Sequence, residues 1–298
     1  MTVLLWAGLI AAITGGDAVQ AVPAPQTAEA ASHQWEEVCA DWDDWDKPGP
    51  PFRVFGNTYY VGTCGIGAIL ITGSDGHVLI DGGTETGAEI IAANVQALGF
   101  DIADIRILLY SHEHFDHVAG LAALQRLSDA RLLASPAAAP VLDTGEDAPS
   151  DPQYGMHEPF PAARVDGVVE DGDVLTLGDI VITAVATPGH TAGAMSWQWQ
   201  SCDDSQCETI VYADSMSPVS ADEYRFSDHP AFLAAYRASI EKLSGLDCTL
   251  LLTPHPSASA LRERLEAGTL TDPAACSDYA EAVDRRLRQR LADETGAP

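Results

Sequence analysis

Three histidines and two carboxylates fall in one short segment of this chain, residues 111–117, which reads Ser-His-Glu-His-Phe-Asp-His. An apolar run over residues 105–110 precedes the segment, and a predicted helix begins near Asp116. The apolar run predicts a buried strand, so the histidines belong to the loop that joins this strand to the helix. We therefore expect a fold that gathers polar side chains where a buried strand ends.

The spacing within this segment suits two neighbouring metal ions. In an extended loop, His112 and His114 point the same way and can reach one metal. Asp116 and His117 follow after the chain turns, and can reach a second metal. Neutral imidazole and carboxylate are ligands that zinc accepts. The alternative is a polar loop with Asp116 as the helix N-cap, which accounts for the aspartate but not for the clustered histidines.

Two isolated histidines follow other predicted strands. His190 comes after an apolar strand at 180–186, and His255 comes after one at 249–252, each in a loop that contains proline. Alone, either residue would be typical of an ordinary loop histidine. Beside the first cluster, both become candidate metal ligands.

Strands and helices alternate along the chain without an internal repeat or an internal linker. This alternation indicates two sheets packed face to face between helical layers. Further strands are expected at 68–72, 77–80, 131–134, 173–177, 195–200 and 209–212, and helices at 85–98, 230–243 and 280–291.

These residues resemble the signature of the metallo-β-lactamase superfamily. The resemblance is carried by His112-x-His114-x-Asp116-His117, His190 and His255. It covers residues 39–291 and implies an α/β fold of the αββα type, a four-layer sandwich with the metal site at one edge of the sheets. It also implies a buried structural role for Asp81.

Finer features are similar to the third subclass of true metallo-β-lactamases, which has no cysteine ligand. Ser215 stands where the first subclass has its cysteine. The resemblance implies two zinc ions, the first held by His112, His114 and His190, and the second by Asp116, His117 and His255. It further implies a zinc-bound hydroxide as nucleophile, which Asp116 orients as the catalytic residue.

The implied substrates are β-lactam antibiotics: penicillins, cephalosporins and carbapenems. Ser215 and Ser217 would bind the substrate carboxylate, and Gln153 would line the pocket. Serine is also an ordinary turn residue, so the two serines could instead only cap their loop. A rival function is that of a glyoxalase II-like thioesterase or lactonase, in which Asp214 would join the metal ligands. Another is a non-catalytic zinc-binding module.

The charge balance excludes two classes of partner. The chain carries 15 basic and 44 acidic side chains, a formal net charge of -29. Such a surface repels nucleic acid and anionic lipid. We expect a small-molecule substrate, no membrane partner after signal cleavage, and a monomer by family resemblance.

The first residues are typical of an export signal. An apolar stretch over residues 3–13 is followed by Val19-Gln20-Ala21, which fits the small-x-small cleavage rule. We therefore expect a signal peptide over 1–21, a flexible leader over 22–38 and a single domain over 39–298. The protein would then be periplasmic or secreted.

Six cysteines agree with export, because disulfides form in oxidising compartments. Six cysteines permit 15 pairings, and the sequence alone does not choose among them. Nearness in the chain favours Cys202 with Cys207 at a hairpin tip. The resemblance to a three-disulfide branch adds Cys39 with Cys64 and Cys248 with Cys276.

Overall fold

The computed structural model describes residues 28–40 and 44–296. The predicted signal peptide lies outside these residues. The end of the predicted leader lies within them and forms helix α1 (Ala28–Val38). Its Trp35 is fully buried against Phe52 and Tyr60, so this part of the leader packs on the domain.

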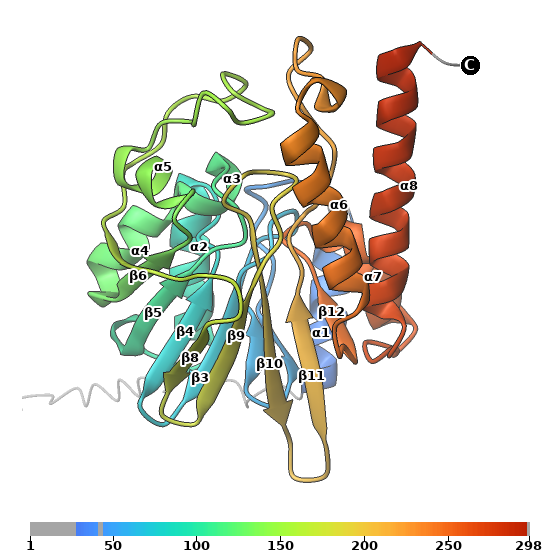
Figure 1. Cartoon of the computed structure of the whole chain (residues 1–298). Coiled ribbons are helices and arrows are strands. Elements are labelled where there is room, and N and C mark those ends of the chain that lie inside the picture. Colours follow the sequence, from blue (N-terminus) through green and yellow to red (C-terminus); the bar gives the residue numbers. More distant parts are fainter. Residues whose placement is uncertain (1–27, 41–43, 297–298) are drawn as a thin grey trace, which may run out of the picture.

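Two β-sheets form the centre of the molecule (Figure 1). The first has seven strands in chain order: β1 (Phe52–Phe55), β2 (Thr58–Tyr60), β3 (Ile69–Gly73), β4 (Gly76–Ile80), β5 (Ile105–Leu109), β6 (Arg131–Ala134) and β7 (Val165–Val168). The second has the order β12-β11-β10-β9-β8: β8 (Val174–Leu177), β9 (Ile180–Ala186), β10 (Met195–Cys202), β11 (Cys207–Tyr212) and β12 (Leu250–Leu252).

Helices cover the outer face of each sheet (Figure 1). The α-helices after α1 are α2 (Glu85–Ala97), α3 (Phe115–Val118), α4 (Leu121–Ser128), α5 (Ala139–Thr144), α6 (Pro230–Ser244), α7 (Leu261–Glu266) and α8 (Ala275–Thr295). Helices α2 and α4 lie on the first sheet, and α6 and α8 lie on the second. The predicted αββα sandwich is confirmed.

Alternating side chains on β10 join the two sheets. Trp197 and Trp199 are buried, whereas Gln198 and Gln200 between and after them are more exposed, as expected for a strand with one covered face. The indole Nε1 of Trp199 donates to Thr58 Oγ1 across the interface, over 3.0 Å. These tryptophans therefore bury apolar area and satisfy their N–H groups between the sheets.

Several strands end at the same edge of the sandwich. β5 pairs in parallel with β4, and β12 pairs in parallel with β11. β9 runs in the same direction as β11, because both are antiparallel to β10. The loops after these strands carry the candidate ligands, so the strand directions bring together residues that lie far apart in the sequence.

The strand and helix predictions hold in most places, with differences at the periphery. Helix α8 begins at Ala275, earlier than the expected residue 280, and its added first turn carries Cys276, which is buried in the core and bonded to Cys248. The short strands β1, β2 and β7 were not predicted. No helix among the described residues is long and apolar enough to cross a membrane.

Three disulfides form in the expected pairs, and no free cysteine remains in the described chain. Cys202–Cys207 closes the β10–β11 hairpin, as nearness in the chain indicated. Cys39–Cys64 ties the end of α1 to the loop before β3, and Cys248–Cys276 ties the start of α8 to the segment before β12.

The disulfides should differ in their contribution to stability. Cys248–Cys276 joins residues 28 positions apart, whereas Cys202–Cys207 joins residues 5 apart. Loop entropy assigns about 3.5 kcal/mol to the longer loop and about 2 kcal/mol to the shorter one. We expect Cys248→Ser with Cys276→Ser to lose roughly 1.5 kcal/mol more unfolding free energy than Cys202→Ser with Cys207→Ser. Urea unfolding measures both losses, and equal values would contradict this.

Candidate metal centre

Three segments at one edge of the sandwich bring the candidate ligands together. The segment after β5 supplies His112, His114, Asp116 and His117, with the last two in α3. The other two, His190 and His255, come from the loops after β9 and β12. The structure therefore places all six predicted ligands in one cluster.

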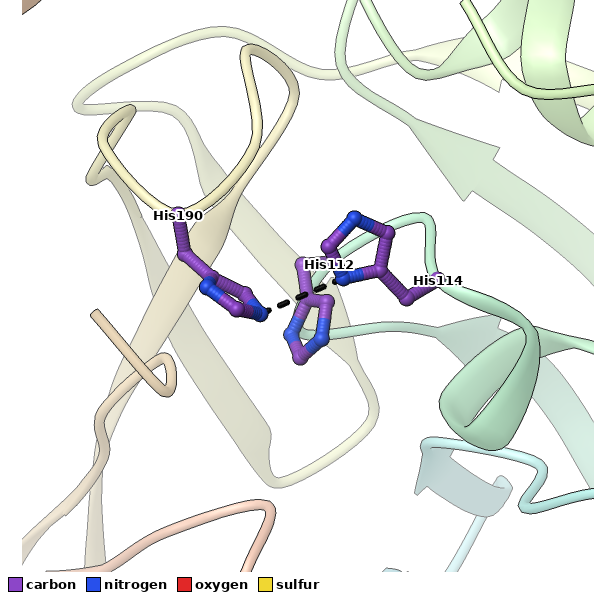
Figure 2. A group of neighbouring side chains, drawn as sticks. All are labelled: His112, His114 and His190. Atoms are coloured by element: carbon purple, nitrogen blue, oxygen red, sulfur yellow. Dashed lines mark hydrogen bonds between the residues drawn. The ribbon is translucent and has the colours of Figure 1, made fainter. Parts of the chain in front are cut away.

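Three histidines form the first group, as Figure 2 shows. One ligand atom from each of His112, His114 and His190 lies within 4.8 Å of the others, and all three side chains are buried. The Nδ1 of His114 lies 3.2 Å from the Nε2 of His190. These distances suit a single ion held between the three rings.

The second group lies beside the first. His112, Asp116 and His117 also bring ligand atoms within 4.8 Å of one another, so His112 stands between the two groups. The Nε2 of His255 lies 3.3 Å from the Nε2 of His117 and 3.4 Å from the Oδ2 of Asp116. Asp116, His117 and His255 thus form the second predicted set.

Four of the histidines have an oxygen atom close to the ring nitrogen that faces away from the group. The pairs are His112 Nδ1 with Asp214 Oδ1 at 2.9 Å, His114 Nε2 with Asp151 Oδ1 at 3.0 Å, His117 Nδ1 with Asp81 Oδ2 at 3.3 Å, and His190 Nδ1 with the Ser217 carbonyl at 2.8 Å. Such partners hold the ring orientation and the tautomer of metal-binding histidines. The inner nitrogen of each ring faces the other candidate ligands.

Burial and neighbouring charges set the protonation of these rings. Burial lowers the pKa of His112 and of His190 well below the usual range, and nearby imidazoles add to the effect. Both rings therefore stay neutral at neutral pH, which is the form that binds a metal.

In the second group, neighbouring charges outweigh burial in setting the pKa of His117 and of Asp116. Burial alone would lower the pKa of His117, but the carboxylates of Asp116 and Asp81 outweigh it and raise the pKa to about 10. Burial alone would raise the pKa of Asp116, but His117 outweighs it and lowers the pKa well below the usual range. Asp116 is therefore ionised, and its negative charge is available to a cation.

Asp81 is a buried carboxylate that contacts the segment carrying the first candidate ligands. Its Oδ1 accepts from the Ser111 backbone N–H at 2.6 Å, and its Oδ2 accepts from the Ser111 and Tyr212 hydroxyls at 2.9 and 2.7 Å. The residue is fully buried and has a φ of 68°, a conformation that aspartate tolerates better than most residues. The predicted buried structural role of Asp81 matches these contacts.

The predicted substrate residues fall in different surroundings. The Nε2 of Gln153 lies 3.4 Å from the Nδ1 of His114, so this amide reaches the first group. The hydroxyl of Ser217 lies 3.2 Å from the Nδ1 of His190, and the residue is half-buried. The hydroxyl of Ser215 is buried and has no hydrogen-bond partner in the described part of the chain.

Sequence reasoning missed two carboxylates of the centre. Asp151 contacts His114 from the long loop after α5, and Glu113 binds the loop of His190. Glu113 was visible inside the histidine segment, but nothing in its spacing indicated a partner. Asp151 precedes proline in an irregular loop and carried no recognisable signal.

Asp214 lies next to a candidate ligand but is not among the ligand atoms of either group. This carboxylate is fully buried, contacts His112 at Nδ1 and accepts from the backbone N–H of Met216 at 3.0 Å. Burial raises its pKa to about 7. It therefore lies behind His112, outside both groups of ligand atoms.

Comparison with known proteins relates this chain to one family. Residues 61–204 match the family described as the metallo-beta-lactamase superfamily. The metallo-β-lactamase MIM-2 is 59% identical and superposes with a TM-score of 0.86, over 89% of this chain and 98% of that chain. MEM-A1, a subclass B3 metallo-β-lactamase isolated from a soil metagenome library, is 41% identical with a TM-score of 0.81, over 86% of this chain and 100% of that chain.

Curated relatives match a smaller part. A hydroxyacylglutathione hydrolase of Maricaulis maris is 32% identical over 109 residues, which are 36% of this chain. The chain thus spans about a third of that relative's length, 32%. The similarity to that relative is therefore limited to part of each chain.

Removing the charge of Asp81 should weaken both the fold and the second group. Asp81→Asn keeps the size and the positive φ but turns one acceptor oxygen into a donor that faces other donors. We expect a loss of about 2 kcal/mol in unfolding free energy and about tenfold weaker binding of one metal ion. Thermal unfolding and metal titration of the metal-free protein measure the two effects.

Asp129→Asn is the matched control, because Asp129 also has a positive φ, 57°, but is exposed. It should leave both quantities unchanged. Equal effects of the two variants would rule out the proposed role of the Asp81 contacts.

Proposed function

Because the chain belongs to the metallo-β-lactamase superfamily and is a metal-dependent hydrolase, we propose that it is a secreted β-lactamase with two zinc ions. It would hydrolyse the amide bond of penicillins, cephalosporins and carbapenems. The observation that carries the proposal is the set of five imidazoles and one carboxylate, divided into two neighbouring groups at one edge of the sheets.

The donor set fits zinc. Neutral imidazole nitrogen and carboxylate oxygen are zinc ligands, and sites with three protein ligands leave a position open for chemistry. His112, His114 and His190 would hold one ion, and Asp116, His117 and His255 the other. When bound, zinc supplies Lewis acidity and makes water acidic enough to act as a nucleophile near neutral pH.

Asp116 is the residue we assign to orienting the attacking water. Its low pKa keeps the carboxylate ionised, so both oxygens accept hydrogen bonds. It lies in the second group, where its Oδ2 is 3.1 Å from the Nε2 of His117 and 3.4 Å from the Nε2 of His255. A carboxylate held there can fix the position of a water molecule beside the substrate carbonyl.

Three residues near the first group are assigned to substrate binding. The amide of Gln153 can donate to a substrate oxygen from its position beside His114. The half-buried Ser217 can donate to a carboxylate of the substrate. It lies in the loop that contacts His190. Ser215 is covered in this conformation, so its hydroxyl supports the loop unless the loop opens.

The main alternative is a thioesterase of the hydroxyacylglutathione hydrolase kind, as the curated relatives suggest. That function would place Asp214 among the metal ligands. The contact of Asp214 with the outer nitrogen of His112 favours the lactamase instead. The nearly full-length match to MIM-2 and MEM-A1 supports the same choice.

Export and a monomeric state remain part of the proposal. Three disulfides support an oxidising compartment, either periplasmic or extracellular. The signal peptide over residues 1–21 is proposed from its sequence pattern alone.

The first test compares two substrates. We expect the purified chain to open a chromogenic cephalosporin, to lose this activity with a chelator, and to regain it when zinc is added. A glutathione thioester should remain intact under the same conditions. Thioester cleavage without lactam turnover would overturn the proposal in favour of the thioesterase, and no turnover of either by the zinc-loaded protein would favour a non-catalytic module.

The second test concerns Asp116. Asp116→Asn removes the charge and keeps the size, so we expect kcat for the cephalosporin to fall at least about 100-fold. Elemental analysis of the variant separates loss of metal from loss of water orientation. The exposed Asp129→Asn should retain full turnover, and an Asp116→Asn protein with normal kcat would refute the assignment.

A further inference from the structure

Glu113 is a buried carboxylate that the proposed chemistry does not use. It lies between His112 and His114 in the extended segment after β5, so its side chain points to the opposite side from theirs. It is 4% exposed, and burial raises its pKa. Because it lies directly between two candidate ligands, its contacts affect the position of the segment that carries them.

Both carboxylate oxygens of Glu113 accept hydrogen bonds from the loop of His190. The Thr191 hydroxyl donates to Oε2 at 2.6 Å, and the Gly193 backbone N–H donates to Oε1 at 2.9 Å. Thr191 follows His190 directly and is fully buried. One side chain thus ties together the two segments that supply the first group.

The loop itself is closed by its own backbone. Thr187 N–H donates to the Ala194 carbonyl, and Gly189 N–H donates to the Thr191 carbonyl, each over 3.0 Å. Contacts that hold Thr191 and Gly193 in this closed loop therefore also hold the adjacent His190.

The approach of Glu113 depends on glycine at position 193. A Cβ there would lie 2.7 Å from the Oε1 of Glu113 and 2.6 Å from the Cβ of Ala138. The backbone can therefore come within hydrogen-bond distance of the carboxylate only because position 193 has no side chain.

We propose that Glu113 is a positioning residue that holds the His190 loop against the His112–His114 segment and so sets the metal affinity of the three-histidine group. The inference rests on the proposed function only in taking that group as a metal site. An apolar side chain of similar size would avoid the cost of a buried charge but leave the Thr191 hydroxyl and the Gly193 N–H without acceptors. The carboxylate serves both donors at once.

The proposal predicts different effects on the two groups of ligands. Glu113 contacts the loop of His190, whereas the second group is held by contacts among its own members and by Asp81. Loss of the Glu113 contacts should therefore weaken one ion and spare the other. A general packing role would weaken both.

The test uses two matched pairs of variants: Thr191→Val with Thr191→Ser, and Glu113→Leu with Glu113→Gln. The first variant of each pair removes the contacts. Thr191→Ser keeps the donor, and Glu113→Gln keeps an acceptor for Gly193 and a polar group for Thr191. Metal-free full-length protein is titrated with Co²⁺ alone, in competition with a chelator, and followed by its absorption spectrum. His190→Ala and His255→Ala assign each spectral signal to its group.

We expect Thr191→Val and Glu113→Leu to lower the affinity of the three-histidine group for Co²⁺ about tenfold or more, with the other group changed less than about threefold. Thr191→Ser and Glu113→Gln should retain most of the affinity. If Glu113→Leu does not fold, Thr191→Val decides. Unchanged affinity in Thr191→Val, or equal weakening of both groups, overturns the inference.

This experiment distinguishes failure of the present inference from failure of the proposed function. Co²⁺ affinity is measured without substrate, so a wild-type chain that binds two ions but opens no lactam loses the proposed function alone. A wild-type chain that opens lactams, with variants that bind both ions normally, loses this inference alone.

Discussion

The buried carboxylate of Asp81 is the contact on which the candidate centre depends. It follows β4, accepts from Ser111 after β5, and accepts from Tyr212 at the end of β11 in the other sheet. A third contact reaches the outer nitrogen of His117. One side chain therefore ties together the ends of strands from both sheets and a ligand of the second group, so sheet packing and ligand geometry cannot vary independently.

Three other histidine rings also have an oxygen atom beside the outer nitrogen, in each case from a loop other than the one that carries the ring. Asp151 holds His114 from the loop after α5, Asp214 holds His112 from the loop after β11, and the Ser217 carbonyl holds His190. Each ligand is thus oriented by a segment other than its own. A change in any of these loops alters the position of a ring nitrogen, so the chemistry of the centre depends on irregular loops that the sandwich supports.

The sequence predicted the sandwich and the six candidate ligands that the structure brings together, because both leave local signals. Apolar runs mark buried strands, and three histidines directly after a buried strand are typical of a metal site. It could not predict the residues that orient the ligands, because their partners are distant in the chain. Asp151 lies 37 positions from His114, and Glu113 lies 80 from Gly193. Short edge strands such as β1 also escaped, since their pairing comes from neighbours rather than from their own periodicity.

Charge explains why such a centre favours cations. The ionised Asp116 lies beside His117 and His255, so its negative charge favours a positive charge there, from a proton or a metal ion. The pKa of His117, raised to about 10, means that protons supply this charge on the ring at neutral pH. A metal ion that binds the inner nitrogen must displace that proton, so metal binding is coupled to proton release. The neutral His112 and His190 carry no such cost, whereas burial of His114 is outweighed by Asp151, which raises the pKa of that ring.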